Sequence, residues 1–515
     1  MTVVQVGTGP VSFTELVAVA RDGAAVELGE DAVTAIGRAR KAVEALAAAP
    51  TPSYGISTGF GALATRHIPA EMRAQLQKSL VRSHAAGSGP EVEREVVRAM
   101  MLLRLSTLAT GHTGIRLQTA RTMAGMLSHG ITPIVHEYGS LGCSGDLAPL
   151  AHCALALMGE GEVYDGQGAR VAAETALRAA GLEPVELEAK EGLALINGTD
   201  GMLGMLVLAL TDLRMLLKTV DVSAAMSVES QLGTDRVFAA DLQALRPHPG
   251  QAASAANLSR ILADSGVVAS HRGPDCNRVQ DAYSLRCAPQ VAGAARDTVE
   301  HAATVAGREL GSAVDNPVVL DDGRVESNGN FHGAPVGYVL DFLAIAAADV
   351  ASMSERRTDR FLDKARSHGL PPFLAGDPGV DSGLMIAQYT QAAIVSELKR
   401  FAVPASVDSI PSSAMQEDHV SMGWSAARKL RTAVDNLTRV VAIELYAAAR
   451  AVELRQADGL TPAPASRAVL AAAREAGVGG PGADRYLSPD IAAAERFVRE
   501  GGLVAAAESV TGPLA

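Results

Sequence analysis

The chain has 515 residues, of which 48% are apolar and 20% charged, a composition that favours large cores over many small modules. Its formal net charge of −12 offers no basic surface for phosphates, which argues against nucleic acid and anionic membranes as partners and favours a small molecule. The four cysteines lack C-x-x-C spacing and the N-terminus lacks a signal-peptide pattern, so we expect a soluble, cytoplasmic protein without disulfides or a metal site.

Along the chain the dominant period is helical. Val33, Ile36, Val43 and Leu46 fall on one stripe, which predicts an amphipathic helix. A second helix is predicted after Pro69, because proline suits a first helical turn and apolar residues recur from position 72 to position 80. The most apolar stretch, residues 201–211, lies between two aspartates and is shorter than the roughly 18 to 20 residues that span a bilayer, so we expect no membrane partner.

The later part of the chain predicts a bundle of long helices. Residues 294–310, 334–366 and 420–454 are rich in alanine and apolar on more than one side, which is typical of helices buried inside a larger assembly. The best strand signal is the segment 317–326, where Asp322-Gly323 forms a hairpin turn. We therefore expect a mainly α fold with small β-hairpins, an N-terminal domain (1–200) with glycine-rich active-site loops, and a long-helix domain (201–515) that forms the oligomer core.

One loop carries unusual chemistry. Residues 139–152 read G-S-L-G-C-S-G-D-L-A-P-L-A-H, and a serine among small residues is most often a turn residue. A nucleophile elbow is excluded because Asp146 stands where its second glycine belongs, and the chain has neither a phosphate-loop nor an H-E-x-x-H motif. Without a Cβ to shield it, however, the amide nitrogen of Gly145 can approach the Cys143 carbonyl carbon and close a five-membered ring around Ser144. Loss of two waters would leave an electrophilic methylidene, with Asp146 and the following helix holding the loop bent.

Six further motifs follow the order expected of one family. They are Y-G-I-S-T-G-F-G at 54–61, S-H-A-A-G at 83–87, N-G-T at 197–199, Q-D-A-Y-S-L-R at 280–286, G-N-F-H at 329–332 and Q-E-D-H-V-S-M at 416–422. With the serine loop, they make the chain resemble the aromatic amino acid ammonia-lyases over almost its full length, and among these the bacterial, histidine-specific members. The resemblance implies a homotetramer with active sites shared between subunits.

The resemblance also implies the cofactor and the base. The family's electrophile is 4-methylideneimidazole-5-one, formed autocatalytically from Ala-Ser-Gly; here it would form from Cys143-Ser144-Gly145, without an external cofactor. Tyr54 would be the base at the β-carbon, which requires stabilisation of its phenolate. Considered alone, Tyr54 would be interpreted as a loop aromatic packed on the body of the protein.

Other site residues are also transferred by resemblance. Arg286 would clamp the substrate carboxylate, since a guanidinium matches a carboxylate bidentately; considered alone it would be a solvated helix arginine. Asn197 and Gln280 would contact the electrophile and substrate. Tyr283, a second catalytic candidate, and Phe331 would shape the cavity. Besides Cys143, which stands where alanine is usual, two positions depart from the family pattern: Asp200 replaces a frequent glutamine, and Met415 replaces an asparagine that is frequent in histidine-specific members.

His84 and Glu417 favour histidine as the substrate. Separately, each would most often be an ordinary exposed residue. An imidazole ring, however, needs a hydrogen-bonding or anionic partner, whereas a phenyl ring would leave a buried carboxylate unpaired at a cost. The pair therefore predicts deamination of L-histidine to trans-urocanate and ammonia, the first step of histidine degradation.

Three alternatives remain open at this point. A tyrosine or phenylalanine ammonia-lyase or an aromatic 2,3-aminomutase would share the electrophile and differ in the ring pocket or in re-adding ammonia. A lyase of the fumarase and aspartase type would share a helical tetramer, but its G-S-x-x-M-P-x-K-x-N-P loop is absent from the chain. A purely structural helical protein would leave residues 143–145 unmodified.

Overall fold

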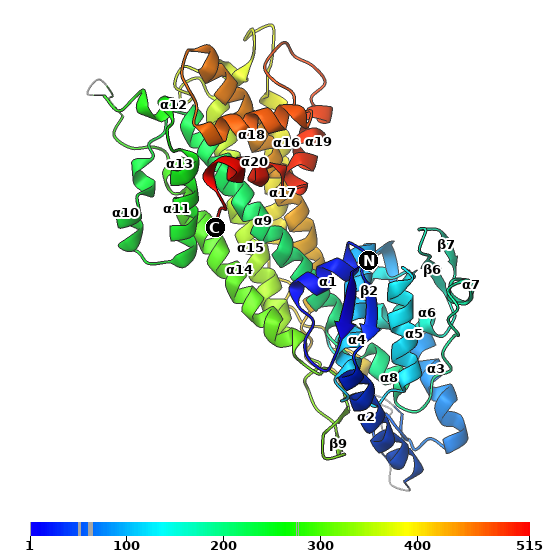
Figure 1. The fold of residues 1–515 in the computed structure, drawn as a ribbon. Helices are drawn as coiled ribbons and strands as arrows, with labels where there is room; N and C mark the ends of the chain where they lie inside the picture. Colours follow the sequence, from blue (N-terminus) through cyan, green and yellow to red (C-terminus); the bar gives the residue numbers. More distant parts are fainter. Residues whose placement is uncertain (1, 50–52, 60–64, 274–275, 277) are drawn as a thin grey trace. The chain divides into compact units, whose positions relative to one another are not determined.

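The computed structural model describes residues 2–49, 53–59, 65–273, 276 and 278–515. Its architecture is mainly α-helical, with short strands, which confirms the predicted fold class (Figure 1). The chain divides into two compact units, each assembled from separate stretches of sequence. The first unit comprises Met1–Leu208, Ala303–Asp341 and Pro404–Arg428, and the second comprises Ala209–Ala302, Phe342–Val403 and Lys429–Ala515. The expected domain boundary at residue 200 stays a prediction.

The elements of the first unit alternate short strands with helices of moderate length. In chain order they are β1 (Val3–Val6), α1 (Phe13–Ala20), β2 (Ala25–Leu28), α2 (Glu30–Ala48), η2 (Ala70–Met72), α3 (Arg73–His84), β3 (Ser88–Glu91), α4 (Arg94–Ala109), α5 (Leu117–Ser128), β4 (Thr132–Pro133), β5 (His136–Tyr138), α6 (Leu147–Leu157), β6 (Glu162–Tyr164), β7 (Arg170–Ala172), α7 (Ala173–Ala179), α8 (Glu191–Ile196), β8 (Val318–Val319), β9 (Val325–Glu326) and η5 (Ser413–Met415).

Long helices dominate the second unit. Four of them contain a boundary between the units: α9 (Asp200–Ser230), α14 (Ala288–Leu310), α15 (Ala334–Leu362) and α17 (Gly423–Ala457). The others are η3 (Arg236–Phe238), α10 (Ala240–Ala244), α11 (Pro249–Ile261), α12 (Gly266–Ala269), α13 (Tyr283–Arg286), η4 (Pro372–Leu374), α16 (Met385–Phe401), α18 (Pro464–Glu475), α19 (Ser488–Arg499) and α20 (Gly502–Thr511).

The predicted local elements form where the sequence places them. The stripe on α2 buries Ile36 and Val43 completely, because both lie on the face that packs inward. Pro69 precedes the short η2 turn, and α3 then buries Leu80 while Met72 stays exposed. Strands β8 and β9 pair antiparallel around the predicted Asp322-Gly323 turn. The structure adds a parallel β1–β2 pair and a three-stranded sheet of β4, β6 and β7.

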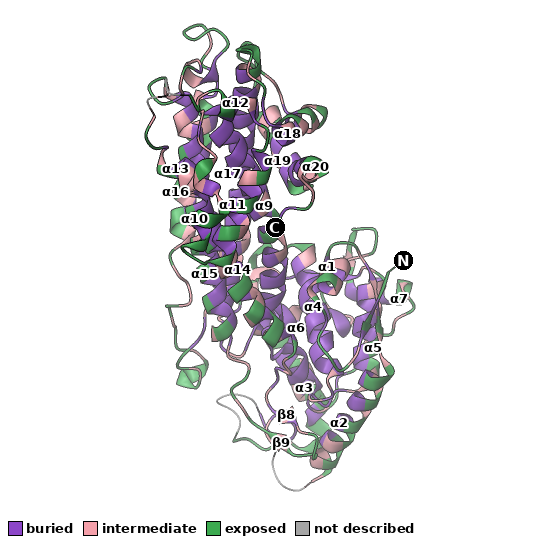
Figure 2. Ribbon diagram, turned by 60° about the vertical axis from the view of Figure 1, so that its left-hand side comes forward, coloured by how far each residue is buried: buried purple, intermediate pink, exposed green. Residues whose placement is uncertain are grey.

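The core of the first unit surrounds α4. Every residue from Val96 to Ala109 is buried, as the purple of this helix in Figure 2 illustrates, so α4 is enclosed by its neighbours. Two arginines are buried inside it. Arg98 donates to the carbonyls of Val19 and Leu127, and Arg104 donates to those of Asn197 and Val314. The guanidinium groups thus replace hydration by backbone acceptors, which makes their burial tolerable.

In the second unit the buried centre includes the later half of α17, where residues 440–452 are all buried. Among the described helices, α15 has the length and composition to cross a membrane, although 61% of its most apolar 18-residue window is buried within the fold. Burial of this extent is what the core helix of a helical bundle shows. Helix α15 is longer than the stretch 201–211, which was predicted to be the most apolar segment of the chain.

Candidate active site

The serine loop is held in a tight turn before α6. Gly142 and Gly145 have φ of +67° and +79°, a left-handed conformation that glycine adopts at little cost. The Ser421 hydroxyl donates to the Gly142 carbonyl at 3.0 Å, and the Met422 amide donates to the Leu141 carbonyl at 2.9 Å. The motif at 416–422 therefore braces the loop directly.

Gly145 lies against Gly198. The two residues form a parallel bridge, and the Asp146 amide donates to the Gly198 carbonyl at 2.7 Å. A Cβ on Gly145 would collide with the backbone of Gly198, and a Cβ on Gly198 would collide with Asp200 and Arg104. Only glycine fits at Gly145, where the clash is with backbone, whereas a Cβ at Gly198 would have to displace two buried charged side chains. The N-G-T motif therefore contacts the loop through its glycine.

Asp146 connects two helices beneath the loop. Its backbone begins α6, while its carboxylate accepts from the Met202 amide in the first turn of α9 at 2.9 Å and from the Ser140 hydroxyl at 2.9 Å. Burial raises the pKa of Asp146 to about 7, opposed by these two hydrogen bonds and reinforced by the nearby charge of Asp200. The carboxyl group can therefore hold or release a proton near neutral pH.

The Ser144 hydroxyl donates to Glu417. The Oγ–Oε1 distance is 3.2 Å, and the other Glu417 oxygen accepts from the Ser412 hydroxyl at 2.8 Å. Residues 412 and 417 also exchange two backbone hydrogen bonds, which fixes Glu417 at the base of a short turn. The fold thus brings together two motifs that are separated by more than half of the chain.

His84 is the last residue of α3, and its ring lies close enough to Glu417 to feel the charge of that carboxylate. The ring is half-buried, and its Nδ1 lies 3.1 Å from the Ser83 hydroxyl. Burial lowers the pKa of His84, while the Leu80 carbonyl and the negative charge of Glu417 raise it. Since burial outweighs the other two effects, the imidazole is favoured in its neutral form, which can both donate and accept a hydrogen bond.

Cys143 is buried beside the same carboxylate. Burial, the charge of Glu417 and a hydrogen bond to Glu417 together raise the pKa of the thiol to about 12. A thiol with so high a pKa stays protonated at neutral pH and is a poor nucleophile. Burial and the neighbouring carboxylate therefore favour the protonated thiol at this position.

Residues 413–415 form a left-handed turn ahead of Glu417. Ser413, Ala414 and Met415 have φ of +52°, +53° and +67°, which is costly for residues with a Cβ. Met415 is 68% exposed. Asparagine adopts this conformation more readily than methionine.

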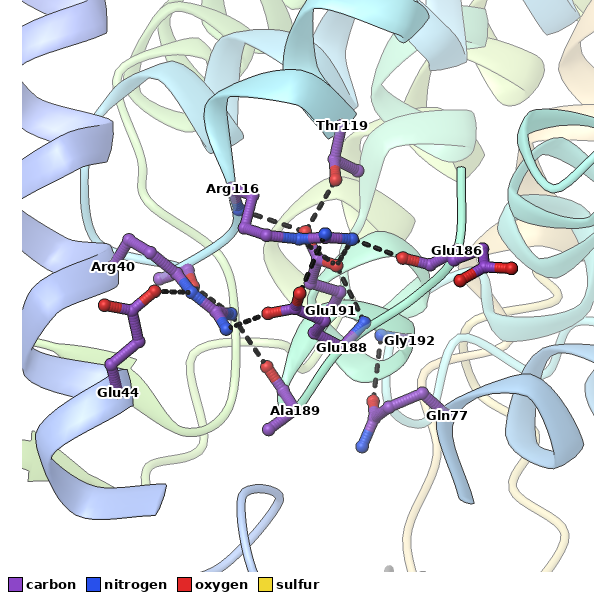
Figure 3. Close-up of polar contacts among 11 residues, drawn as sticks. Arg40, Glu44, Gln77, Arg116, Thr119, Glu186, Glu188, Ala189, Glu191 and Gly192 are labelled. Atoms are coloured by element: carbon purple, nitrogen blue, oxygen red, sulfur yellow. Dashed lines mark hydrogen bonds and ion pairs between the residues drawn. The ribbon is translucent and has the colours of Figure 1, made fainter. Parts of the chain in front are cut away.

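Asn197 directly follows α8, and a polar cluster secures the other end of that helix (Figure 3). Glu191 is fully buried and accepts hydrogen bonds from the Arg116 guanidinium and the Thr119 hydroxyl. Gln77 of α3 accepts from the Gly192 amide at 2.9 Å. Because α8 has six residues, these anchors determine where Asn197 lies.

The helices α3, α6 and α8 pack against one another in all three pairs. His84 ends α3, the electrophile triplet precedes α6, and Asn197 follows α8. Asn197 is buried; its amide nitrogen donates to the Asn316 carbonyl at 3.1 Å, and its Oδ1 has no hydrogen-bond partner among the described residues. One small helical cluster therefore presents three of the predicted site motifs.

Tyr54 and Phe331 are half-buried in loops of the first unit. The Tyr54 loop closes on itself through hydrogen bonds from the amides of Ile56 and Ser57 to the Ser53 carbonyl. Phe60 and Gly61, which complete that motif, lie outside the described residues. A cavity of about 690 Å³ borders the other loop, lined among others by Asn330, His332 and Glu309. Ser144 and Glu417 are not part of its lining, so we assign it no role in the site.

Three predicted site residues belong to the second unit. Arg286 lies over the Tyr283 ring, 4.7 Å from its centroid, a cation–π contact, and the ring is 70% exposed. Gln280 is exposed in the loop that precedes α13. The buried Arg357–Glu444 ion pair supports this short helix, because Arg357 also donates to the Ser284 carbonyl at 3.3 Å.

The chain was compared with known proteins. Residues 11–475 match the family described as aromatic amino acid lyase. The histidine ammonia-lyase of Streptomyces griseus is 71% identical over 515 residues, 100% of both chains. The tyrosine aminomutase structure from Streptomyces globisporus superposes with a TM-score of 0.93 at 37% identity, covering 99% of this chain and 100% of that one. The histidine ammonia-lyase structure from Trypanosoma cruzi gives 0.90 at 36% identity, covering 99% and 96%.

The chain belongs to the aromatic amino acid lyase family. It is a carbon–nitrogen lyase of the ammonia-lyase type, as the sequence motifs predict. The two unrelated alternatives, a fumarase-type lyase and a purely structural helical protein, are wrong. Which ring-bearing amino acid this lyase takes depends on the pocket side chains and is argued below.

Some supporting residues of this lyase escaped sequence reasoning. Arg104 and Ser412 hold site residues from positions outside every motif, and Gly198 acts through its missing side chain. The available signals were weak: an arginine within an apolar helix, and a glycine inside N-G-T. The role of each of these two residues becomes apparent only when the fold brings distant segments of the chain together.

Proposed function

We propose that this lyase removes ammonia from L-histidine without oxidation, giving trans-urocanate, as the first step of histidine degradation. The observation that carries the proposal is the Glu417 carboxylate, held by Ser412 and reaching Ser144 at 3.2 Å, with the half-buried His84 nearby. A histidine ammonia-lyase at 71% identity over the full chain supports the same substrate. The proposal includes a cytoplasmic location, in keeping with four cysteines that lack C-x-x-C spacing.

The loop suits 4-methylideneimidazole-5-one formed from Cys143, Ser144 and Gly145. The turn at Gly145 has no room for a Cβ, and its neighbour Asn197 keeps a buried oxygen without a partner among the described residues. This prosthetic group supplies an electrophile for the substrate's amino group, which then departs more easily. Asn197 would hold the group, and no external cofactor is required.

The remaining residues bind the substrate and move its proton. Tyr54 removes a β-hydrogen as its phenolate, from a loop whose glycines permit closure. Arg286 binds the α-carboxylate bidentately, with Tyr283 stacked beneath the guanidinium. Gln280 contributes a further polar contact. Phe331 shapes the apolar wall of the pocket.

Glu417 and His84 recognise the imidazole. A carboxylate beside a neutral histidine can accept the ring N–H of the substrate while His84 satisfies the other nitrogen. A phenyl or phenol ring would leave the carboxylate without this donor, at the cost of an unpaired, partly buried charge. The pair therefore selects against phenylalanine and tyrosine more than it attracts histidine.

An aromatic 2,3-aminomutase is the second candidate. The observation that favours it is the superposition on the tyrosine aminomutase of Streptomyces globisporus with a TM-score of 0.93. Identity to that protein is 37%, against 71% to the histidine ammonia-lyase of Streptomyces griseus. Proteins that share a fold can act on different substrates. The higher sequence identity therefore carries more weight than the superposition, and we place histidine deamination first.

A panel of amino acids tests the substrate. Purified protein is incubated with L-histidine, L-tyrosine and L-phenylalanine, while ultraviolet absorbance records the conjugated product and chromatography detects any β-amino acid. We expect urocanate from histidine and little product from the other two. Formation of a β-tyrosine would instead establish the aminomutase.

The proposal includes a homotetramer with shared sites. Apolar side chains that stay exposed on α15 and α16 support it, namely Tyr338, Phe342, Ile345, Ile386 and Tyr389. Mixing provides the test: Tyr54→Phe and Arg286→Leu, each inactive alone, are unfolded together and reassembled. If subunits share sites, mixed tetramers regain part of the activity. No recovery in verified mixed tetramers would mean that each chain completes its own site.

A further inference from the structure

Asp200 is one of the three positions where this chain departs from the pattern that the family resemblance implies, and the proposed mechanism gives it no role. It is the first residue of α9 and is almost fully buried. Its Oδ2 lies 3.5 Å from Nη1 of Arg104, which is itself completely buried in α4. That oxygen has no hydrogen-bond partner among the described residues. Burial raises the pKa of Asp200 and the charge of Arg104 opposes that rise, so the contact offsets part of the cost of burying the carboxylate.

Arg104 uses its hydrogen bonds to hold backbone. Nη1 donates to the Asn197 carbonyl at 2.7 Å and Nη2 to the Val314 carbonyl at 2.8 Å. An uncompensated guanidinium would be costly at such a site, so a counter-charge is needed. Lys190, the other buried cation nearby, already pairs with Asp315 at 2.5 Å. Asp200 is thus the carboxylate available to Arg104.

The Asp200–Arg104 pair lies directly against Gly198. A Cβ on Gly198 would meet both the Asp200 carboxylate and the Arg104 guanidinium, which shows how closely they cover one side of it. On its other side, Gly198 contacts Gly145 and accepts the Asp146 amide at 2.7 Å. Gly198 is therefore clamped between the ion pair and the residue whose nitrogen must attack.

We propose that Asp200, paired with Arg104, is a positioning residue for closure of the electrophile ring, because it holds Gly198 against Gly145. This inference rests on the proposed function. In closure, the Gly145 nitrogen bonds to the Cys143 carbonyl carbon; the carbonyl oxygen leaves as water with the hydrogens of the Gly145 and Ser144 amides. The Ser144 hydroxyl then leaves as a second water with the hydrogen on its own Cα. No electrons are gained or lost overall.

The Asp200 carboxylate acts on the rate of this closure and not on the finished site. Misplacing reacting groups by about 1 Å can cost roughly a hundredfold in rate. In Asp200→Asn the counter-charge is lost, Arg104 shifts, and the support of Gly198 loosens. We expect ring closure to slow by roughly ten- to a hundredfold. Sites that do close should bind and turn over histidine as in the wild type.

The experiment follows closure by mass. Wild type, Asp200→Asn and the control Glu309→Gln are made by cell-free synthesis, translation is stopped, and the peptide spanning residues 143–146 is weighed over time. Glu309 is a suitable control because it is a second carboxyl near Asp200 that bonds Thr199 and does not contact Arg104. Sedimentation and thermal unfolding report the folded fraction, and KM and kcat are measured per closed site.

Slow closure in Asp200→Asn, with Glu309→Gln and the kinetics per closed site unchanged, supports the proposal. Closure at the wild-type rate, or an altered KM in closed sites, overturns it while leaving the proposed function intact. A wild-type peptide that keeps both waters overturns the proposed function instead. Should Asp200→Asn not fold, Arg104→Met with Asp200→Asn removes both charges together: slow closure in its folded fraction supports the proposal, and normal closure overturns it.

Discussion

The two sides of the Ser144 loop are built differently. Beneath it, Gly145, Gly198, Asp146 and Arg104 are buried and joined by short hydrogen bonds, in positions where the glycines tolerate no side chain. Above it, Glu417 lies at the end of the exposed left-handed turn 413–415, held mainly by Ser412. The buried side suits a reaction that must happen once in every chain. The exposed side suits a choice of substrate, which changes among relatives.

Chemistry and substrate specificity are therefore separable in this site. The backbone of the loop needs a rigid floor, since ring closure depends on the approach of two main-chain atoms. Recognition of a ring needs a few polar side chains, which a short turn can supply. Changes beneath the loop should therefore abolish or retard activity toward every substrate, and changes above it should redistribute activity among substrates.

Removing the Ser144 hydroxyl should have the largest effect. Ser144→Ala cannot form the methylidene, so the fold should persist while histidine turnover falls by about a thousandfold or more. Cys143→Ala is the matched control next to it and should keep most of the activity, because the side chain lies outside the ring. Near-normal turnover by Ser144→Ala would mean that the chemistry does not use this loop.

Asp146 should make stability depend on pH. Its folded pKa of about 7 exceeds the usual 3.8, so the native state binds more protons and its stability falls as pH rises between these values. In a Ser144→Ala background, the unfolding free energy relative to Asp146→Asn should fall by at most about 4 kcal/mol between pH 4 and pH 7. Denaturant titrations measure it; a constant difference would show that the buried carboxyl is ionised throughout.

Glu417→Gln should shift substrate preference. Loss of a charge-assisted hydrogen bond of about 1.5 to 3 kcal/mol corresponds to roughly one to two decades in kcat/KM for histidine. His84→Leu should act in the same direction, and the double variant should lose less than the sum because both residues serve one ring. Phenylalanine turnover by the same variants is the control. Unchanged histidine kinetics in both single variants would place ring recognition elsewhere.

Met415→Asn should have the smallest effect, and it acts on stability. Asparagine relieves part of the strain at φ +67°, so the unfolding free energy should rise by about 0.5 to 1 kcal/mol. Met415→Leu, whose side chain cannot hydrogen-bond to the local backbone, should give no increase. Equal stability of the two variants would mean that the turn relaxes away from this conformation.

Much of the fold could be predicted from sequence, because helical spacing depends on local chemistry. The stripe on α2 and the Asp322-Gly323 hairpin are examples. The parallel β1–β2 pair was not predicted, since each strand has four residues and is stabilised by packing within the first unit. Short strands carry too little pattern to be recognised alone.

The candidate site divides in the same way. Ser144, Glu417 and His84 were identified through their motifs, and the structure brings them together, whereas their roles remain predictions. The support of Gly198 by Arg104 and Asp200 could not be predicted, because it depends on a contact between Arg104 of α4 and the segment that leads into α9, which lie far apart in sequence. The positive φ of Met415 was also hidden, since nothing in a methionine signals it.

The mass of the peptide that contains Cys143, Ser144 and Gly145, taken from active wild-type protein, tests most directly whether the electrophile forms from these residues. Ring closure and serine dehydration each release one water, so the peptide should lack two waters relative to its encoded mass. The same peptide from Ser144→Ala has no serine hydroxyl to lose, so it should not lack the second water and should carry no methylidene. An intact wild-type peptide in protein that turns over histidine would contradict the account.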